Sequence, residues 1–580
     1  AAANAAAAAP ADDVPDLRPR TPLDALAARL GPPRRYQLTR WLVLRLLGFI
    51  YVFAFLGLIL QGPGLLGSHG LTPIAAYLHR LRGNGLDFWD APSLFWGDAS
   101  DGAIAAWAWV GLALSIVVLL GYANAPILLA LWAIYASFVH LGQTWFSFGW
   151  EIQILETTLL AAALAHPWDP RPLRAPSPPP AAIVLMRWLA FRIMLGAGLI
   201  KLRGDACWTH LTCLDAHFET QPIPNPLSPF FHHAPHWVHA AGVLFNHVVE
   251  VGLPWFVFGP RRLRRVAAVG MAAFQVVLIL SGNLAFLNWL TLVPVLACLD
   301  DDFLLRLVPR RPRAWLEARL AAPPARDLRQ LLLAFAAGAV VAITFALASF
   351  DADLVLFVLL VPAAIVGAHA ARAHVASPGR RLDGHLLAVG LLAGIVAVRS
   401  VDVVENLASH HQAMNRSYDR FDLVNTYGAF GSVGTVRHEL VLEGTQDADP
   451  DHATWHAYEL PCKPGPLDRR PCVLGPYHRR LDWLIWFAAM DPQPADPWLI
   501  HLVYGLLDGN RAMRTLLAVD PFHGEKPTFI RIRRFVYHLA PPGAPTWWTR
   551  DHEELWLPPI SLANRGLRPF LARYGWETAP

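Results

Sequence analysis

The chain has 580 residues, of which 54% are hydrophobic and only 16% are charged, and its mean hydropathy is +0.35. Soluble globular proteins carry charge on about a quarter of their residues, so this composition excludes an ordinary soluble protein. The net charge of +4 is small and the arginines lie between apolar runs, which argues against nucleic acid as a partner.

Three regions follow one another along the chain. Residues 1–33 are rich in alanine and proline and lack a charged segment followed by an apolar one, so we expect a disordered tail rather than a cleaved signal peptide. Residues 34–404 contain one apolar run after another and predict a multi-helix transmembrane domain. Residues 405–580 have short apolar runs and frequent turn residues, and they predict a strand-rich extracytoplasmic domain.

A helix that spans a membrane needs about 20 mostly apolar residues. The apolar runs therefore predict a polytopic α-helical membrane protein of about 11 transmembrane helices with a C-terminal strand-rich soluble domain. The expected helices lie at 40–61, 103–121, 125–141, 149–166, 183–202, 240–258, 265–281, 283–299, 328–349, 353–371 and 384–402.

Positive charge sets the expected orientation. Arg34, Arg35 and Arg40 precede the first helix, which predicts a cytoplasmic N-terminus. With eleven crossings, the other arginine-rich connections fall on that same side; they are 167–182, 259–264, 300–327 and 372–383. The 203–239 loop and the C-terminal domain are then expected outside the cytoplasm.

Within the C-terminal domain, alternating hydrophobicity predicts strands at 438–444, 455–460 and 528–539. Two segments with helical periodicity, 482–490 and 498–507, predict short amphipathic helices that rest on an apolar surface.

Four of the five cysteines fall in the expected extracytoplasmic regions, where disulfides persist. We predict the pairs Cys207–Cys213 and Cys462–Cys472, and the alternative is free buried thiols. Cys298, at the expected cytoplasmic end of a helix, should be a reduced thiol in the core. The spacings contain neither a CxxC pair nor a zinc pattern.

Lys201 is one of only three lysines and ends the apolar run at 183–202. Lysine can lose its proton when desolvated, whereas arginine cannot. Polar residues gather after it, and the candidate catalytic residues are Lys201, Asp205, His210, His217 and Glu250. The alternatives are that Lys201 marks the helix end at the membrane interface, or forms a structural ion pair with Asp205.

Glu250 lies in an apolar helix and therefore needs a partner, for which His247, Lys201 and Arg192 are candidates. His247 and Glu250 share a helix face and could bind a metal with neighbouring histidines. Those neighbours are His210, His217, His232 and His233. Because histidine-rich loops more often form ordinary hydrogen bonds, no metal site is predicted. Glu151 and Glu156 are expected to face the bundle interior.

A polar and aromatic cluster in the outer domain is typical of a surface that contacts another protein. The candidate client-binding residues are Asn425, Tyr427, Arg437, Tyr477, Arg479, Arg480, Asp482 and Trp483. The alternative is a local core with buried ion pairs.

Several runs resemble the lipase maturation factor family: GLIKLRGDACWTHLTCLDAHFETQPIPNPL (198–227), SGNLAFLNWLTLVPVLACLDDD (281–302), NTYGAFGSV (425–433), CKPGPLDRRPCVLGPYHRRLDWLIWFAAM (462–490) and LLAVDPFHGEKPTFIRIRRFVYHL (516–539). The resemblance implies a polytopic membrane protein that helps secreted lipases fold and assemble. It therefore implies two partners, the lipid bilayer and a secreted client such as a lipase, and no cofactor is expected. The composition, rich in arginine, alanine and proline, suggests a bacterial chain. The expected location is then the bacterial inner membrane, with the C-terminal domain in the periplasm.

A shorter pattern is similar to the vitamin K-dependent carboxylase group, in which a lysine at this kind of position acts as a base. The matching residues are Gly198, Lys201, Leu202, Asp205 and Trp208. The alternative function is therefore a membrane enzyme centred on Lys201. A third hypothesis is disulfide exchange by the two cysteine pairs, and the absence of CxxC argues against it.

Overall fold

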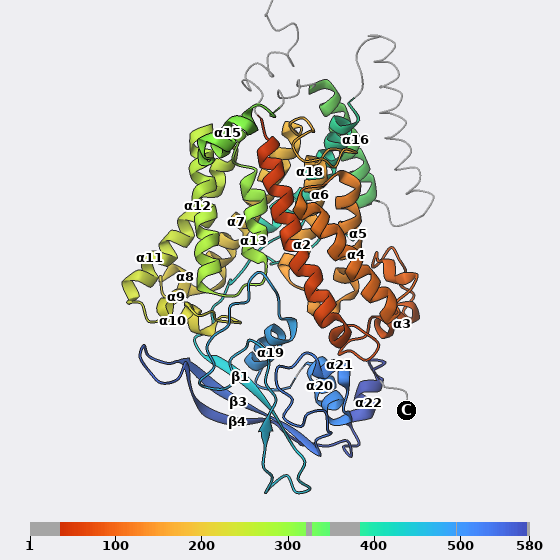
Figure 1. The fold of residues 1–580 in the computed structure, drawn as a ribbon, viewed down its shortest axis with the longest axis vertical. Coiled ribbons are helices and arrows are strands. Elements are labelled where there is room, and N and C mark those ends of the chain that lie inside the picture. Colours follow the sequence, from red (N-terminus) through yellow and green to blue (C-terminus); the bar gives the residue numbers. More distant parts are fainter. Residues whose placement is uncertain (1–34, 321–327, 348–382, 495, 577–580) are drawn as a thin grey trace, which may run out of the picture.

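The computed structural model describes residues 35–320, 328–347, 383–494 and 496–576. A bundle of helices occupies one end of the molecule, and a sheet with short helices occupies the other (Figure 1). The long elements of the bundle are α2 (Gln37–Leu65), α4 (Asp101–Leu120), α5 (Ala125–Leu141), α6 (Gly149–Leu164), α7 (Pro180–Gly204), α11 (His236–His247), α12 (Arg261–Ser281), α13 (Leu287–Leu296), α16 (Leu328–Leu347) and α18 (Gly384–Ala408).

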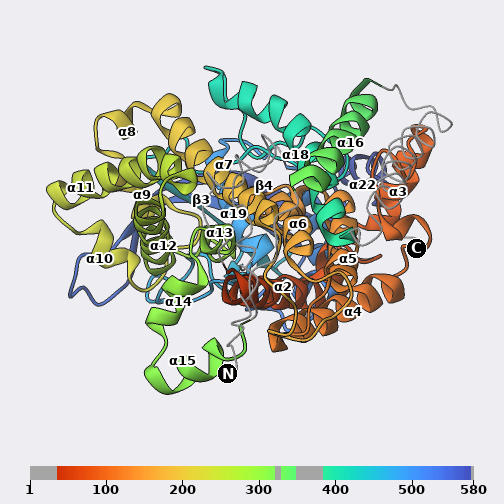
Figure 2. The same ribbon diagram turned by 90° about the horizontal axis from the view of Figure 1, so that it is seen from above.

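Short elements connect these helices or extend them. They are α3 (Ile74–Gly83), η1 (Leu94–Trp96), η2 (Gln143–Phe146), α8 (Ala206–Thr209), α9 (Cys213–Thr220), α10 (Ser228–His232), η3 (Val248–Gly252), η4 (Leu253–Phe258), α14 (Asp301–Leu307) and α15 (Arg310–Glu317). Seen from above, α6, α7 and α13 lie in the middle, with α11 and α12 on one side and α4 and α5 on the other (Figure 2).

Six stretches of the described chain are long and apolar enough to cross a membrane. They are Gln37–Leu65, Asp101–Leu120, Pro180–Gly204, His236–Phe258, Arg261–Ser281 and Gly384–Ala408. The expected count of about eleven is therefore not confirmed. Three further expected spans are helices of only 17, 16 and 10 residues (α5, α6 and α13), and the expected span at 353–371 lies outside the described residues.

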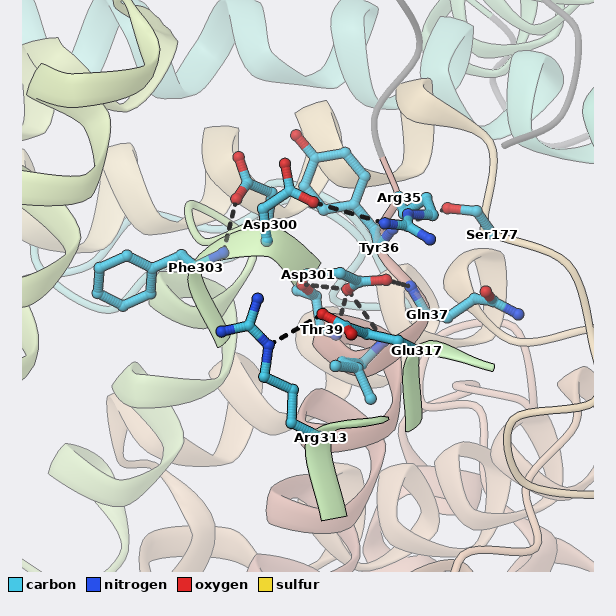
Figure 3. Close-up of polar contacts among 12 residues, drawn as sticks. Arg35, Tyr36, Gln37, Thr39, Ser177, Asp300, Asp301, Phe303, Arg313 and Glu317 are labelled. Carbon is cyan, nitrogen blue, oxygen red and sulfur yellow. Dashed lines mark hydrogen bonds and ion pairs between the residues drawn. The ribbon is translucent and has the colours of Figure 1, made fainter. Parts of the chain in front are cut away.

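The first turn of α2 lies at the end of the bundle away from the sheet (Figure 1). Asp301 accepts hydrogen bonds from the backbone N–H groups of Gln37, Leu38 and Thr39 at 2.8, 3.0 and 3.2 Å (Figure 3). The first N–H groups of a helix have no partner within the helix, so this carboxylate satisfies donors that would otherwise be buried without one. The link fixes the start of α2 to the first residue of α14.

The sheet has four antiparallel strands in the order β2-β1-β3-β4. The strands are β1 (Arg437–Thr445), β2 (His456–Ala457), β3 (Phe529–Leu539) and β4 (Trp548–Ile560). Strands β1 and β3 match the predicted positions. Strand β2 is shorter than predicted, because Glu459 leaves β1 and pairs with Val519. Strand β4 was not predicted, and its exposed run of charged residues is typical of an edge strand.

Among the described residues of 405–580, which we call the outer domain, four helices accompany the sheet: α19 (Arg480–Met490), α20 (Pro497–Asp508), α21 (Arg511–Arg514) and α22 (Leu567–Ala572). Both predicted amphipathic helices are present as α19 and α20, and each buries most of its apolar side chains. Near the C-terminus, the Trp576 ring stacks on His501 of α20 with centroids 4.9 Å apart, and His501 Nδ1 lies 2.7 Å from the carbonyl oxygen of Leu71. The outer domain therefore rests directly on the connection between α2 and α3.

Arg480 of α19 reaches into the bundle. Its guanidinium lies 2.8 Å from a carboxylate oxygen of Glu151 on α6, and Glu151 also accepts a hydrogen bond from Tyr135 of α5. The backbone N–H of Arg480 donates to Gln61 of α2 at 2.9 Å. Arg480 and Glu151 are 2% and 0% exposed. Arg480 of the outer domain is thus bonded to α6 through its side chain and to α2 through its backbone.

Replacement of Arg480 by methionine should leave Glu151 buried without its guanidinium. Removing one partner of a buried ion pair costs about 3–5 kcal/mol, so the free energy of unfolding in detergent should fall by about that amount. The double variant Arg480→Met, Glu151→Gln should recover much of the loss, because no buried charge is left.

The matched control is Arg479→Met, since Arg479 is half-buried and its guanidinium stacks on the Tyr477 ring at 5.3 Å. Thermal unfolding of the purified variants measures the difference. Equal losses in Arg480→Met and Arg479→Met would contradict a special role for the pair.

Candidate functional site

Lys201, near the end of α7, lies in a buried polar cluster. Its ammonium nitrogen is 2.7 Å from Glu250 Oε2 and donates a hydrogen bond to Asn246 Oδ1 at 2.9 Å. Asn246 in turn donates to Glu250 Oε2 at 3.1 Å. The three residues are only 4–5% exposed, and the Trp208 ring lies 5.0 Å from the ammonium. We call Lys201, Asn246 and Glu250 the lysine cluster.

Two local features bring the lysine cluster together. The helix after α11 widens into the π-helical turn η3, which carries Glu250; such turns are frequent at functional sites. Gly198 lies one turn before Lys201 on α7, and a Cβ atom there would come within 2.7 Å of Val251 Cγ2 and 3.0 Å of the Glu250 backbone. The absence of a side chain at Gly198 therefore allows α7 and η3 to lie this close.

The other predicted residues of this site take different places. Lys201 pairs with Glu250, one of its expected partners, and not with Asp205, which caps α8 and accepts a hydrogen bond from the Val433 backbone at 3.3 Å. His210 is exposed. His217 is buried against the Phe430 ring, 4.9 Å away. Burial, together with the charge of Lys201, lowers the pKa of His217 to about 4.

The histidines near this cluster make separate contacts. His247 Nε2 lies 3.0 Å from the carbonyl oxygen of Trp208, and His232 lies 3.4 Å from Glu219. Within the part of the chain that the structure describes, no three histidine, cysteine or acidic side chains are grouped so that they could hold a metal ion. Asn246 was not among the predicted site residues. It precedes Glu250 by four residues, however, and this spacing places two side chains on one helix face.

A second buried cluster joins the segment after α18 to the bundle. Glu156 of α6 pairs with Arg192 of α7, and it accepts hydrogen bonds from the Tyr427 hydroxyl at 2.7 Å and the Asn425 backbone at 3.1 Å. Arg192 also donates to the carbonyl oxygen of Asn425 at 2.8 Å. All four residues are at most 4% exposed. Asn425 and Tyr427 thus lie inside the molecule.

A third cluster joins β1 to the proline-rich segment after α9. Arg437 donates to the carbonyl oxygen of Glu219 at 2.7 Å and to that of Pro222 at 3.0 Å, and it pairs with Glu439 at 2.6 Å. Lys463 shares Glu439, with its ammonium 2.6 Å from the other carboxylate oxygen. Arg437 therefore fixes the extended segment to the sheet and is itself 1% exposed.

The remaining candidates for client contact lie at the same junction. Asp482 accepts from the backbone N–H groups of Cys462 and Lys463 at 2.6 and 2.9 Å, and Trp483 packs against Trp150 with ring centroids 5.1 Å apart. The Tyr477 hydroxyl accepts from Gln61 at 3.0 Å.

Six of the eight candidates for client contact are buried, and only Tyr477 and Arg479 are partly exposed. The six buried residues therefore lie in the interior of the junction between the two domains. Contact of these eight residues with a client stays a prediction.

The two expected cysteine pairs are close in space. The Cα atoms of Cys207 and Cys213 lie 4.8 Å apart and those of Cys462 and Cys472 lie 5.6 Å apart, and the sulfur atoms of each pair are within bonding distance. Asn283, before α13, donates to the carbonyl oxygen of Cys472 at 2.9 Å, so the second pair is held against the bundle. Cys298 is a buried free thiol.

This arrangement defines an integral membrane protein whose outer domain is bonded into its helix bundle. Residues 38–306 match the family model of the lipase maturation factor transmembrane domain, and residues 423–558 match that of the lipase maturation factor C-terminal domain. The chain belongs to the lipase maturation factor family.

The similarity to individual members covers nearly the whole chain. Lipase maturation factor 1 of Bos taurus is 40% identical, with 93% of this chain and 92% of the relative covered. The Homo sapiens protein of the same name is 39% identical, with 93% and 90% covered. Lipase maturation factor 2 of Mus musculus is 31% identical, with 91% and 83% covered. No solved structure matches the chain.

Substitution of Gly198 by alanine should separate α7 from η3. The added methyl group has no room beside Val251 and the Glu250 backbone, and overpacking of this kind costs about 1–3 kcal/mol. Gly252→Ala is the matched control, because nothing lies within 4 Å of a Cβ atom there. Thermal unfolding in detergent should show a loss for Gly198→Ala alone, and an equal effect of both variants would contradict the packing argument.

The stability of the protein should fall between about pH 6.5 and pH 4. The folded state holds the pKa of His217 near 4, below its ordinary value, so the unfolded chain takes up the proton more readily and is favoured as the pH drops through this window. A shift of this size contributes up to about 3 kcal/mol, which is lost at low pH. His217→Gln should reduce the pH dependence of the melting temperature, whereas the exposed control His210→Gln should keep it. An unchanged profile in His217→Gln would rule out this assignment.

Proposed function

We propose that this chain is an assembly factor in a bacterial inner membrane, with its N-terminus in the cytoplasm and its outer domain in the periplasm. Its clients are secreted proteins, a lipase among them. The single observation that carries the proposal is the similarity to lipase maturation factor 1 across both domains, with 93% of the chain covered. The second and third buried clusters and the Arg480–Glu151 pair support it further, because they hold the outer domain against the bundle.

Client contact should occur on exposed apolar side chains of the outer domain. Most of the eight candidate client-binding residues make their contacts within the junction between the two domains. Phe487 and Met490 of α19, in contrast, are 43% and 46% exposed. They lie one helical turn apart and so present one apolar face. A client that has not yet buried its own apolar surface would be stabilised by such a face.

The second candidate function is a membrane enzyme that uses Lys201. The observation that favours it is the burial of a lysine, a glutamate and an asparagine beside a buried histidine, since polar groups within a membrane domain are costly and often functional. Against it stands the contact of the Lys201 ammonium with two acceptors, which is the arrangement of a structural ion pair.

The test is co-expression of the chain in a bacterium with a secreted lipase, measuring lipase activity per amount of secreted lipase. Deletion of the factor should lower this ratio several-fold, and Phe487→Asp with Met490→Asp should lower it at normal expression. Leu562→Asp, which changes another exposed leucine, is the control. An unchanged ratio on deletion would refute the proposal.

Lys201→Arg separates the two candidates in the same assay. Arginine keeps the charge and the pairing with Glu250 but cannot act as a base. Retained maturation with this variant is expected of the assembly factor, and loss of maturation at normal expression would favour the enzyme.

A further inference from the structure

The outer domain contains a cavity of about 220 Å³ beside strand β1. Three consecutive residues of β1, Leu440, Val441 and Leu442, line it. Because successive side chains of a strand point to opposite faces of the sheet, the cavity must pass around the edge of β1 rather than lie under one face.

That edge is open because its neighbouring strand ends early. Strand β2 pairs with β1 only at Glu443 and Gly444. One more backbone hydrogen bond follows, from Tyr458 to the carbonyl oxygen of Leu442 at 2.9 Å, and then Glu459 turns away to pair with Val519. The edge of β1 from Leu442 toward the N-terminal end of the strand therefore faces the cavity.

The inner end of the cavity is apolar. Leu440 and Leu442 point to the face that packs on the helices, where Ile485 of α19 and Leu502 of α20 complete the lining. All four are at most 4% exposed. An apolar cavity of about 150 Å³ is large enough to hold benzene, so this one has room for a longer hydrocarbon segment.

The other end of the cavity is positively charged. Lys463 lines it, and Lys463 and Arg437 share the single carboxylate of Glu439 at 2.6 Å each. Arg550 also lines it and donates a hydrogen bond to the Tyr537 hydroxyl at 3.3 Å. The acidic lining residue Glu459 is neutralised by Arg469. Cations therefore outnumber carboxylates at this end.

One lining residue supplies an unsatisfied polar group. Tyr458 is 6% exposed, and its hydroxyl has no hydrogen-bond partner within the described residues. A buried hydroxyl without a partner is unfavourable, and a polar ligand group would relieve this.

We propose that this cavity binds a single-chain anionic amphiphile of the fatty-acid class. The hydrocarbon chain would lie among Leu440, Leu442, Ile485 and Leu502, and the carboxylate would lie at Lys463 and Arg550. Charge complementarity and the apolar inner end favour this ligand over an uncharged chain. The proposal does not depend on the maturation of a lipase.

The experiment uses the full chain in lipid nanodiscs and a photoreactive dodecanoate, with the labelled peptides mapped by mass spectrometry. Labelling is expected on β1 and on the 457–466 segment, and dodecanoate should compete for it at lower concentration than dodecanol. Arg550→Gln should weaken binding on the order of tenfold, because a charge-assisted hydrogen bond to the ligand is lost. Arg565→Gln, another exposed arginine, should leave it unchanged.

A second pair of variants tests the cavity itself. Leu517 lines the cavity, so Leu517→Trp should fill part of it with a larger side chain. Val519→Trp places the same side chain two residues away, at a position that does not line the cavity. Labelling should fall on the order of tenfold in the first variant alone, with equal melting temperatures showing that both are folded. Labelling confined to the bundle, equal competition by dodecanol, or displacement by an apolar peptide but not by dodecanoate would each overturn the proposal.

Discussion

Two glutamates buried in one short helix determine how this molecule is assembled. Glu151 and Glu156 of α6 are both fully buried in an apolar bundle, and an unpaired carboxylate in such a place is strongly unfavourable. Each is compensated by an arginine: Arg480, which comes from the outer domain, and Arg192, which holds the segment around Asn425. Glu151 is thus paired with a cation only when the outer domain is docked on the bundle.

This constraint explains why most of the polar and aromatic candidate residues of the outer domain are buried. Arg437 binds a backbone carbonyl that is 218 residues away in the chain, and Arg480 binds a carboxylate that is 329 residues away. Such buried, hydrogen-bonded charges specify one relative position of two domains, because any other position would leave them without partners. The exposed part of α19, with Phe487 and Met490, remains as a surface that can meet other molecules.

In the lysine cluster, too, buried charged groups pair with each other across two elements. Lys201, Asn246 and Glu250 form hydrogen bonds with one another, and Gly198 makes their approach sterically feasible. The cluster joins α7 to η3 as Arg480 joins α19 to α6. Its geometry accounts for the presence of a lysine without requiring chemistry at that position.

Apolar runs and alternation along the chain were enough to predict most helices, strands β1 and β3, both amphipathic helices and the two cysteine pairs, because these depend on local periodicity and spacing. The same patterns did not predict β4, because its charged edge does not alternate between apolar and polar residues. They also predicted too long a helix at α13, because the residues before it bind the proline-rich segment and the Cys472 loop. Which partner Glu250 takes, and which outer-domain residues are buried, depended on contacts between distant segments. The sequence by itself determined that carboxylates and cations must be buried together in an apolar environment. Only the tertiary structure decided their pairing, because pairing depends on distances that no local pattern contains.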